Sequence, residues 1–462
     1  MEILILIAVL VGAVWGAAFL RQSGLLGGCL AVLVAAACFG LPMMKIELGP
    51  MPLTTDRMLI VALAAQYVVW RRLGWCDAKP IGKQEITLFA LLAILIVSNF
   101  TSDWRVEGYR PVSRLILDYL MPAVMYWVAR QTRQTPRSLL AVLGFFAVFG
   151  LYMALTTIAE YLQLWPLVFP RYIVTTVQGG VAEFIGRGRG PLLTPIANSV
   201  MLCIGMTAAL CWWPRLGRVG QLALVAATLA FLAALYCTLT RSCWMSGLFT
   251  LAMVFGLTLP RGWRLPVLSV GAVVVLAVVV TQWEHVMVYK RDKAMEAQKS
   301  AESAELRPIL ARVAWNMFLD HPWFGCGYSH YYDEHTKYTF DRTTALPLEQ
   351  ARGYVSHNVL LTLLTETGLV GLTAFVTLLA FWTRDAWRLW RRTAAPLCAR
   401  QIGLVMMIAL GTYLLNGMFH DTSIMPLMNL TLFFLAGTVE GLRPDAAGRL
   451  PCDRTDGPCR TI

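Results

Sequence analysis

The chain is built mainly of apolar runs of about twenty residues, separated by polar connections. A helix of that length spans the roughly 30 Å hydrocarbon core of a bilayer, and it pairs its own backbone polar groups where no water can reach them. The first run follows Glu2 instead of basic residues and lacks a small-residue cleavage site, so we expect it to be retained as a span. The pattern predicts spans at residues 3–20, 24–42, 57–72, 86–100, 113–129, 138–162, 191–213, 218–240, 243–259, 264–283, 358–383, 401–418 and 424–441. We therefore expect an all-α integral membrane protein with twelve or thirteen transmembrane helices.

Composition excludes an ordinary soluble domain. Hydrophobic residues make up 57% of the 462 residues, and charged residues make up 14%, against about 25% in soluble proteins. The mean hydropathy is +0.60. All three values favour a polytopic membrane protein that lies among membrane lipids and has no appended soluble catalytic domain.

The formal charge of +12 does not indicate a nucleic-acid partner, because the basic excess is distributed over short connections between spans. Such clusters normally remain on the cytoplasmic side of a membrane. The clusters are Arg71, Arg72, Lys79 and Lys83; Arg130, Arg133 and Arg137; Arg215 and Arg218; Arg261 and Arg264; and Arg384, Arg388, Arg391 and Arg392. This placement puts both long polar connections, residues 163–190 and 284–357, on the side of the membrane opposite the cytoplasm. The second forms a large extracytoplasmic loop between the tenth and eleventh predicted spans.

The cysteines predict neither a disulfide framework nor a metal centre. Five of the eleven fall within apolar spans, where cysteine usually acts as a small buried hydrophobe: Cys29, Cys38, Cys203, Cys211 and Cys237. Cys452 and Cys459 lie in the polar C-terminal tail without a nearby histidine. The outer loops also lack a cluster of acidic residues at cation-binding spacing. We therefore expect no metal and no cofactor.

Two outer segments carry arginines at the membrane edge. Arg187 and Arg189 alternate with glycines immediately before an apolar helix that starts at Pro191. Glycines allow backbone amides to approach an anion, and guanidinium groups bind phosphate in bidentate geometry. Arg241 lies in a short turn between two apolar runs, where a charge needs a partner or a polar cavity. In both segments the alternatives are a bound anionic substrate and contact with lipid headgroups.

A third outer segment contains a predicted amphipathic helix that ends at Asp320. Arg312, Trp315 and Leu319 would share one face of it at helical spacing. A turn follows, since proline stops a helix and glycine permits positive φ. The turn residues are Pro322, Gly325 and Gly327.

The fourth segment contains a histidine at the start of the eleventh span. Ser356 is a plausible N-cap, which would place His357 in the first turn, where the helix dipole disfavours an imidazolium. A neutral imidazole can accept a proton, although a capping or headgroup contact is the alternative. Glu366 lies about half a turn round from His357 on an ideal helix, so it is not a direct partner without a break. Gly368 and Gly371 permit such a break, with the part before it along the interface and the part after it crossing the membrane.

The order and spacing of these four segments resemble the O-antigen ligase and polymerase superfamily of bacterial envelope transferases. The resemblance covers about residues 184–383. The matching residues are Arg187 and Arg189 before an apolar helix; Thr240-Arg241-Ser242 at a helix turn; Arg312 through Asp320-His321-Pro322 to Gly325-Cys326-Gly327; and His357-Asn358 followed by Glu366-Thr367-Gly368-Leu369-Val370-Gly371.

The resemblance implies N-terminal transmembrane helices (1–162), a catalytic membrane domain (163–441) that includes loop 284–357, and a polar tail (442–462). It also implies transfer of glycan from an undecaprenyl-diphosphate carrier to an acceptor hydroxyl at the periplasmic face of the bacterial inner membrane. The acceptor would be lipid A-core or another glycan. Neither a nucleotide sugar nor a metal would be needed, and other envelope polysaccharide assembly proteins could be partners.

The resemblance also assigns roles to residues. His357 would deprotonate the acceptor, and Arg241 would offset charge on the leaving diphosphate, with inversion at the anomeric carbon. The remaining substrate-binding candidates are Arg187, Arg189, Arg312, Asn358 and Glu366.

Alternatives remain within and outside this superfamily. Lipid A-core ligation, polymerisation and transfer to a protein hydroxyl share these motifs, and the lack of an extended C-terminal periplasmic domain favours the first two. A flippase or transporter of lipid-linked glycan is the rival from another class, and a non-catalytic scaffold is a third possibility. Transport pathways usually place ionisable groups near the bilayer midplane, whereas the candidate cations here cluster at one predicted face.

Overall fold

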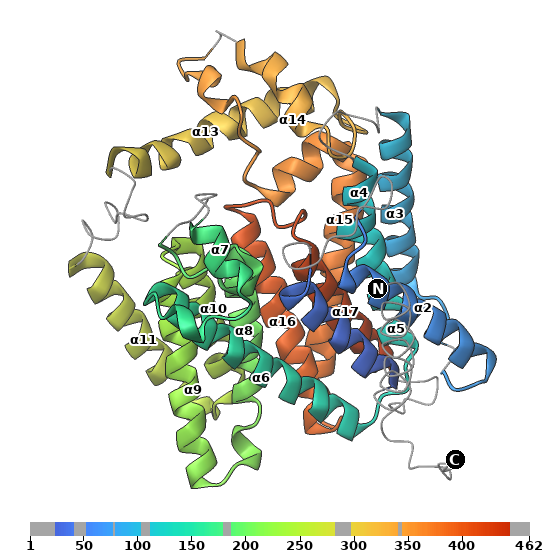
Figure 1. Ribbon diagram of the computed structural model, residues 1–462, viewed down its shortest axis with the longest axis vertical. Helices are drawn as coiled ribbons and strands as arrows, with labels where there is room; N and C mark the ends of the chain where they lie inside the picture. The colour runs from blue at the N-terminus through green and yellow to red at the C-terminus, as the bar shows by residue number, and fades with distance from the viewer. Residues whose placement is uncertain are drawn as a thin grey trace, which may run out of the picture.

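The computed structural model describes residues 24–40, 52–76, 79–102, 111–178, 186–281, 297–340 and 344–443, and they fold into helices joined by turns (Figure 1). The N-terminal half contains α2 (Thr55–Arg72), α3 (Lys83–Thr101), α4 (Pro111–Leu115), the π-helical turn η1 (Ile116–Leu120), α5 (Met121–Gln131), α6 (Pro136–Tyr161), η2 (Trp165–Leu167), α7 (Tyr172–Gln178), η3 (Gly190–Leu192), α8 (Pro195–Leu210) and η4 (Trp213–Arg215). The C-terminal half contains α9 (Arg218–Cys237), α10 (Arg241–Thr258), α11 (Arg261–Thr281), α13 (Ala297–Asp320), α14 (Tyr331–Glu334), η5 (His335–Phe340), η6 (Leu348–Ala351), α15 (Val359–Arg391), α16 (Leu397–Gly417) and α17 (Pro426–Gly441).

This architecture confirms an all-α membrane protein. Each predicted apolar segment after the first overlaps described helical structure, while segment 3–20 lies outside the described residues. The start predicted at Pro191 was wrong, because η3 and the left-handed backbone of Leu193 precede α8, which starts at Pro195. Within the described ranges, seven helices are long and apolar enough to cross a membrane: Lys83–Thr101, Pro111–Gln131, Pro136–Tyr161, Pro195–Arg215, Arg218–Cys237, Val359–Arg391 and Leu397–Gly417. The total of twelve or thirteen spans and the outward placement of loop 284–357 stay predictions.

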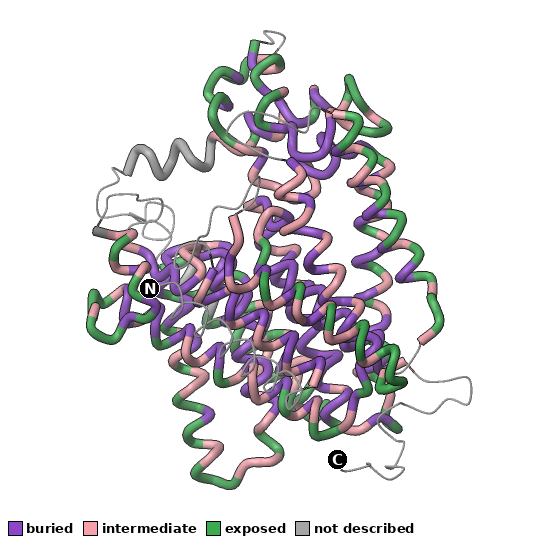
Figure 2. Tube along the Cα trace, turned by 45° about the vertical axis from the view of Figure 1, so that its right-hand side comes forward, coloured by how far each residue is buried: buried purple, intermediate pink, exposed green. Residues whose placement is uncertain are grey.

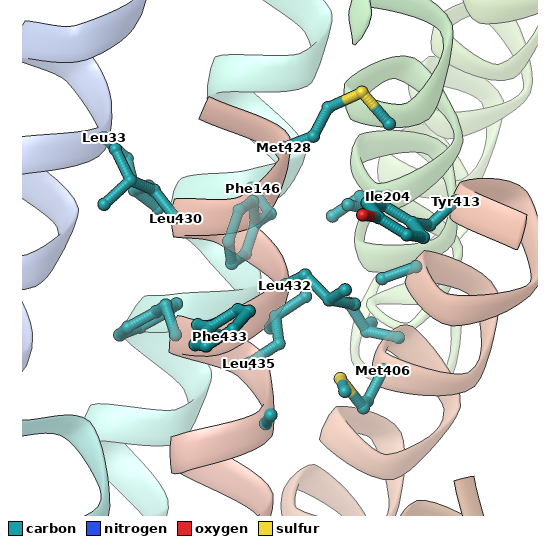
Figure 3. Close-up of a cluster of buried hydrophobic side chains, with 14 of the residues drawn as sticks. Leu33, Phe146, Ile204, Met406, Tyr413, Met428, Leu430, Leu432, Phe433 and Leu435 are labelled. Atoms are coloured by element: carbon teal, nitrogen blue, oxygen red, sulfur yellow. The ribbon is translucent and has the colours of Figure 1, made fainter. Parts of the chain in front are cut away.

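The core lies where α5, α6, α8, α16 and α17 pack together, and Figure 2 shows buried residues concentrated in this central bundle. Figure 3 shows Phe146 of α6, Ile204 of α8 and Tyr413 of α16 around the apolar side chains of α17. Small residues allow the helices to approach closely. A Cβ atom on Gly205 would lie 2.7 Å from the Cα atom of Gly150 on α6. The backbone contact between α6 and α8 therefore depends on both glycines.

The eleventh predicted span, α15, consists of two helical segments that meet at a kink at Gly368, where φ is +64°. The break that the sequence predicted is thus confirmed. It interrupts the helical hydrogen-bond ladder, and the turn after α13 replaces the missing partners. The bonds run from Leu369 N to Pro322 O (2.9 Å), Val370 N to Trp323 O (3.2 Å), Cys326 N to Thr365 O (2.9 Å) and Gly327 N to Glu366 O (3.1 Å). The turn after α13 is therefore joined to α15 through backbone contacts.

Two glycines make this junction possible. A Cβ atom on Gly368 would lie 2.3 Å from the carbonyl carbon of Trp323, and one on Gly325 would lie 2.3 Å from that of Glu366. Gly325 and Gly327 have φ values of +71° and +115°, which confirms the positive φ predicted for this turn. Neither close approach leaves room for a side chain.

The described part of the loop between α11 and α15 forms a small helical layer at one end of the bundle, seen at the top of Figure 1. Its helix α13 ends at Asp320 as predicted, but it is 24 residues long instead of short. One face of α13 packs on α14, η5 and η6 through a second apolar cluster: Ile309, Leu310, Val313, Ala314, Met317, Tyr331, Leu348 and Ala351. Trp315 and Leu319 are exposed on the other face, in the predicted register with Arg312.

The opposite end of the bundle joins residues from the connections predicted to be cytoplasmic. Asp385 near the end of α15 accepts hydrogen bonds from Gln84 of α3 and from Arg443, which follows α17. Arg130 at the end of α5 pairs with Glu85 at 2.7 Å. These contacts bring the basic ends of α5, α15 and α17 together with the start of α3, as a shared cytoplasmic side would require.

Candidate functional site

His357 lies immediately before α15 and is not part of the helix. The expectation that Ser356 caps the helix was wrong. The cap is Asn358, whose Oδ1 accepts hydrogen bonds from the backbone N–H groups of Leu360 (2.9 Å) and Leu361 (3.1 Å). Ser356 instead shares a hydrogen bond with the Thr362 hydroxyl. Both residue types make good caps, and side-chain geometry decides between them.

The backbone of His357 has a φ of +50°. A non-glycine residue adopts this conformation only when its surroundings impose it, and such residues gather at functional sites. Asn358 supplies part of that constraint, because its Nδ2 also donates to the carbonyl of Met418 (3.3 Å). The start of α15 is therefore attached to the end of α16.

The environment of His357 favours the neutral imidazole. Its pKa is lowered below the usual 6.5, first by burial and then by the positive charge of Arg307. The helix dipole was the cause predicted from the sequence, but the residue precedes the helix. Its ring lies 6.0 Å from the ring of His420 and 6.5 Å from that of Tyr354. A neutral imidazole in this position can accept a proton at neutral pH.

Arg307 is a site residue that the sequence analysis missed. It lies on α13, with its guanidinium 4.8 Å from the ring centroid of Phe419 in the connection after α16. Burial lowers its pKa, and the positive charge of Arg241 lowers it further. Arg307 therefore lies within electrostatic range of both Arg241 and His357. The structure brings together three basic groups from the start of α10, from α13 and from the residue before α15.

The spacing of apolar residues in the sequence could have identified Arg307 as a candidate site residue. It shares helical spacing with the buried residues Leu310 and Ala314, so an arginine lies at the edge of the apolar face of α13. Arg312 is five residues further on and about 140° round the helix, so the two arginines face different directions. Arg312 is half-buried, and its Nε is a buried donor without a hydrogen-bond partner among the described residues. Of the two, Arg307 is the one that faces His357.

Arg189 is held in a buried ion pair with Glu160 at the end of α6. Its Nε donates to Glu160 Oε1 (2.9 Å), and the backbone N–H groups of Arg189 and Gly190 both donate to Glu160 Oε2 (2.7 Å each). The two side chains are 2% and 3% exposed. The charge of Arg189 is thus balanced inside the protein, away from lipid headgroups.

Arg187 is also buried, at 7% exposure. The next residue ties this loop to α9, because Gly188 N donates to the carbonyl of Cys237 (2.8 Å). A Cβ atom on Gly188 would lie 2.4 Å from a methyl carbon of Thr157, so the loop needs glycine here. The α9 end leads within four residues to Arg241. The structure therefore places the Arg187 loop beside the turn that carries Arg241.

Glu366 is buried beneath the segment that follows α13. Its carboxylate accepts from the backbone N–H of Tyr331 (3.4 Å) and from that of Ser329. The carboxylates of Asp118 and Asp421 are its electrostatic neighbours, together with the balancing charge of Arg114. Glu366 thus holds the loop that follows Gly327, in addition to any contact with substrate.

Among the described residues, no group of three or more histidine, cysteine, aspartate or glutamate side chains is placed to hold a metal ion. Asp421 instead accepts hydrogen bonds from Ser423 N (3.0 Å) and Ser423 Oγ (2.6 Å), and burial raises its pKa. The arrangement supplies positive charge beside His357 through guanidinium groups.

Comparison with known proteins agrees with the C-terminal part of this site. Residues 224–376 match the family model described as O-antigen ligase. The matched range contains Arg241, Arg307 and His357, whereas Arg187 and Arg189 precede it. No curated protein matches the chain. The resemblance found in the sequence is therefore confirmed over this range.

Proposed function

We propose, from the premise that residues 224–376 form an O-antigen ligase domain, that this membrane protein is a glycosyltransferase. It moves glycan from an undecaprenyl-diphosphate carrier to an acceptor hydroxyl at the outer face of the bacterial inner membrane. The acceptor is lipid A-core or the end of another glycan. The observation that carries the proposal is the grouping of His357, Arg307 and Arg241 from three separate elements.

In the proposed reaction the acceptor oxygen attacks the anomeric carbon. The bond from that carbon to the diphosphate oxygen breaks, and undecaprenyl diphosphate leaves with the electron pair. The acceptor proton moves to neutral His357. Because attack and departure occur on opposite sides, the anomeric centre inverts. General-base help of this kind typically contributes about 10²–10⁴-fold to the rate.

The arginines act on the leaving group. Arg241 and Arg307 offer paired N–H donors that match phosphate oxygens, and their charge offsets the charge that develops as the bond breaks. Arg307 has a second effect, since its charge favours the neutral imidazole of His357 before the donor arrives. A bound diphosphate would balance that charge and make His357 a stronger base. Donor binding thus prepares the site for proton transfer.

A mainly apolar cavity beside the arginine loop supports a lipid-linked donor, and Thr54, Asp56 and Arg57 add polar groups to its lining. It has a volume of about 340 Å³ and lies between the helix Gly24–Cys38, α17 and the start of α8. Pro191, Leu192 and Ala197 line it on one side, and Leu427 and Leu430 line it on another. A cavity of this size accepts a few isoprene units next to the diphosphate. Arg187 precedes the lining segment by four residues.

The rival function is transport of the same lipid-linked glycan, and a detergent assay separates the two. Purified protein is incubated with undecaprenyl-diphosphate glycan and candidate acceptors, and the donor is followed by mass spectrometry. A transferase consumes the donor in detergent and releases undecaprenyl diphosphate, and the product mass distinguishes ligation from polymerisation. A donor left intact in detergent but moved across liposome bilayers would support a transporter and contradict the proposal.

A further inference from the structure

A second cavity lies at the end of the bundle opposite His357, between the ends of α15 and α17. Its volume is about 540 Å³. Three arginines and one aspartate line it together with an apolar wall: Arg388, Arg392, Arg443, Asp385, Leu389, Val439 and Leu442. The proposed transfer reaction uses none of these residues, so the cavity needs a separate explanation.

The acidic groups at this cavity are already engaged. Asp385 is 8% exposed and pairs with Arg443 at 2.8 Å and with Arg384 at 3.0 Å. Arg443 also pairs with Glu440 at 2.7 Å. Among the described residues at this end, the four arginines Arg384, Arg388, Arg392 and Arg443 therefore outnumber the two carboxylates of Asp385 and Glu440. Arg388 is 68% exposed and forms the longest of these ion pairs, at 3.7 Å from Asp385, so its guanidinium stays accessible at the surface.

The position and the lining together define the chemistry of a ligand. The cavity lies at the end predicted to face the cytoplasm, where basic pockets between helices bind anionic lipid headgroups. Leu389, Val439 and Leu442 provide apolar surface beside the guanidinium groups. A volume of this size accepts a phosphoglycerol headgroup and the first methylenes of its chains, while the rest of the acyl chains stays in the bilayer.

We propose that this cavity is a binding site for an anionic phospholipid of the cytoplasmic leaflet. The phosphate lies against Arg388 and Arg392, and the glycerol and upper acyl chains pack on Leu389, Val439 and Leu442. Occupancy bridges the ends of α15 and α17. A free phosphate compound shares the phosphate contacts, but it would gain nothing from the apolar wall.

The test uses the purified full-length chain in mild detergent and counts bound lipid on intact protein by native mass spectrometry. The probes are phosphatidylglycerol, zwitterionic phosphatidylcholine and inorganic phosphate. The cavity variant is Arg388→Gln with Arg392→Gln. The matched control is Arg71→Gln with Arg72→Gln, an exposed pair at the end of α2 on the same predicted side.

Each arginine near the headgroup should contribute about fivefold in affinity, so the cavity variant should bind phosphatidylglycerol roughly 25-fold more weakly. The control pair should change binding by less than about threefold. Equal losses in the two variants would overturn the proposal in favour of general surface attraction. Equal binding of phosphatidylcholine by the wild type would also overturn it, as would displacement of phosphatidylglycerol by equimolar inorganic phosphate.

Discussion

Replacing Glu160 by glutamine should destabilise the protein strongly, because it leaves the charge of Arg189 buried without compensation. The carboxylate accepts three hydrogen bonds of 2.7 to 2.9 Å, and both side chains are nearly inaccessible. Removing one partner of a buried ion pair typically costs about 3–5 kcal/mol. Glutamine can still accept from the backbone N–H groups of Arg189 and Gly190, so the expected loss comes mainly from the charge.

A double-mutant cycle isolates this interaction. Glu160→Gln, Arg189→Gln and the double variant are purified in the same detergent, and their unfolding is followed by circular dichroism. The double variant carries neither charge, so it should lose clearly less stability than the sum of the single variants, with a coupling of about 1–3 kcal/mol. Additive losses, or a loss below about 1 kcal/mol for Glu160→Gln, would refute the pairing. Arg189 would then be available to a phosphate, as the sequence first allowed.

Three further predictions concern the junction, the base and the absence of a metal. Gly368→Ala should sharply lower the yield of folded protein, because the added Cβ would lie 2.3 Å from the backbone of Trp323. Gly256→Ala is the control and should not lower the yield, because its Cβ would lie 3.6 Å from a methyl carbon of Leu268, an ordinary packing distance. Equal yields of the two variants by size-exclusion chromatography would contradict the contact between Gly368 and the turn after α13. The kcat/KM of the wild type should rise with pH through a pKa below 6.5 and then level off, because the neutral imidazole of His357 is the active form. Arg307→Gln should move this rise to higher pH, because it removes the positive charge that disfavours the imidazolium. An unmoved profile would show that Arg307 does not act on His357. Transfer should continue in excess EDTA, because guanidinium groups supply the positive charge, and activity restored only by added divalent metal would contradict that mechanism.

The sequence predicted the membrane-spanning elements because hydrocarbon imposes a length and a polarity on each helix. It also predicted the break at Gly368 and the turn at Gly325 and Gly327, since glycine is the residue type that these backbones need. At the start of α15, residue type alone did not identify the N-cap. Ser356 and Asn358 are both competent caps, and only the fold shows which side chain meets the N–H groups.

Long-range pairing could not be predicted from the sequence. Arg189 and Glu160 are 29 residues apart, in a loop and at a helix end, and nothing local connects them. The sequence identified Arg312 from the family resemblance and from the helix face that it shares with Trp315 and Leu319, whereas the fold turns Arg307 towards His357 and Arg241. The direction in which a helix face points depends on the docking of α13, which the polar loop sequence does not specify.

The direct test of the account is the turnover rate of His357→Ala with undecaprenyl-diphosphate glycan and acceptor in detergent. His321→Ala serves as the control, because that exposed histidine lies just after α13. The account predicts that His357→Ala stays folded and loses about 10²–10⁴-fold in rate, while His321→Ala retains wild-type turnover. Normal donor consumption and product formation by folded His357→Ala would contradict the proposed role of this residue as the general base.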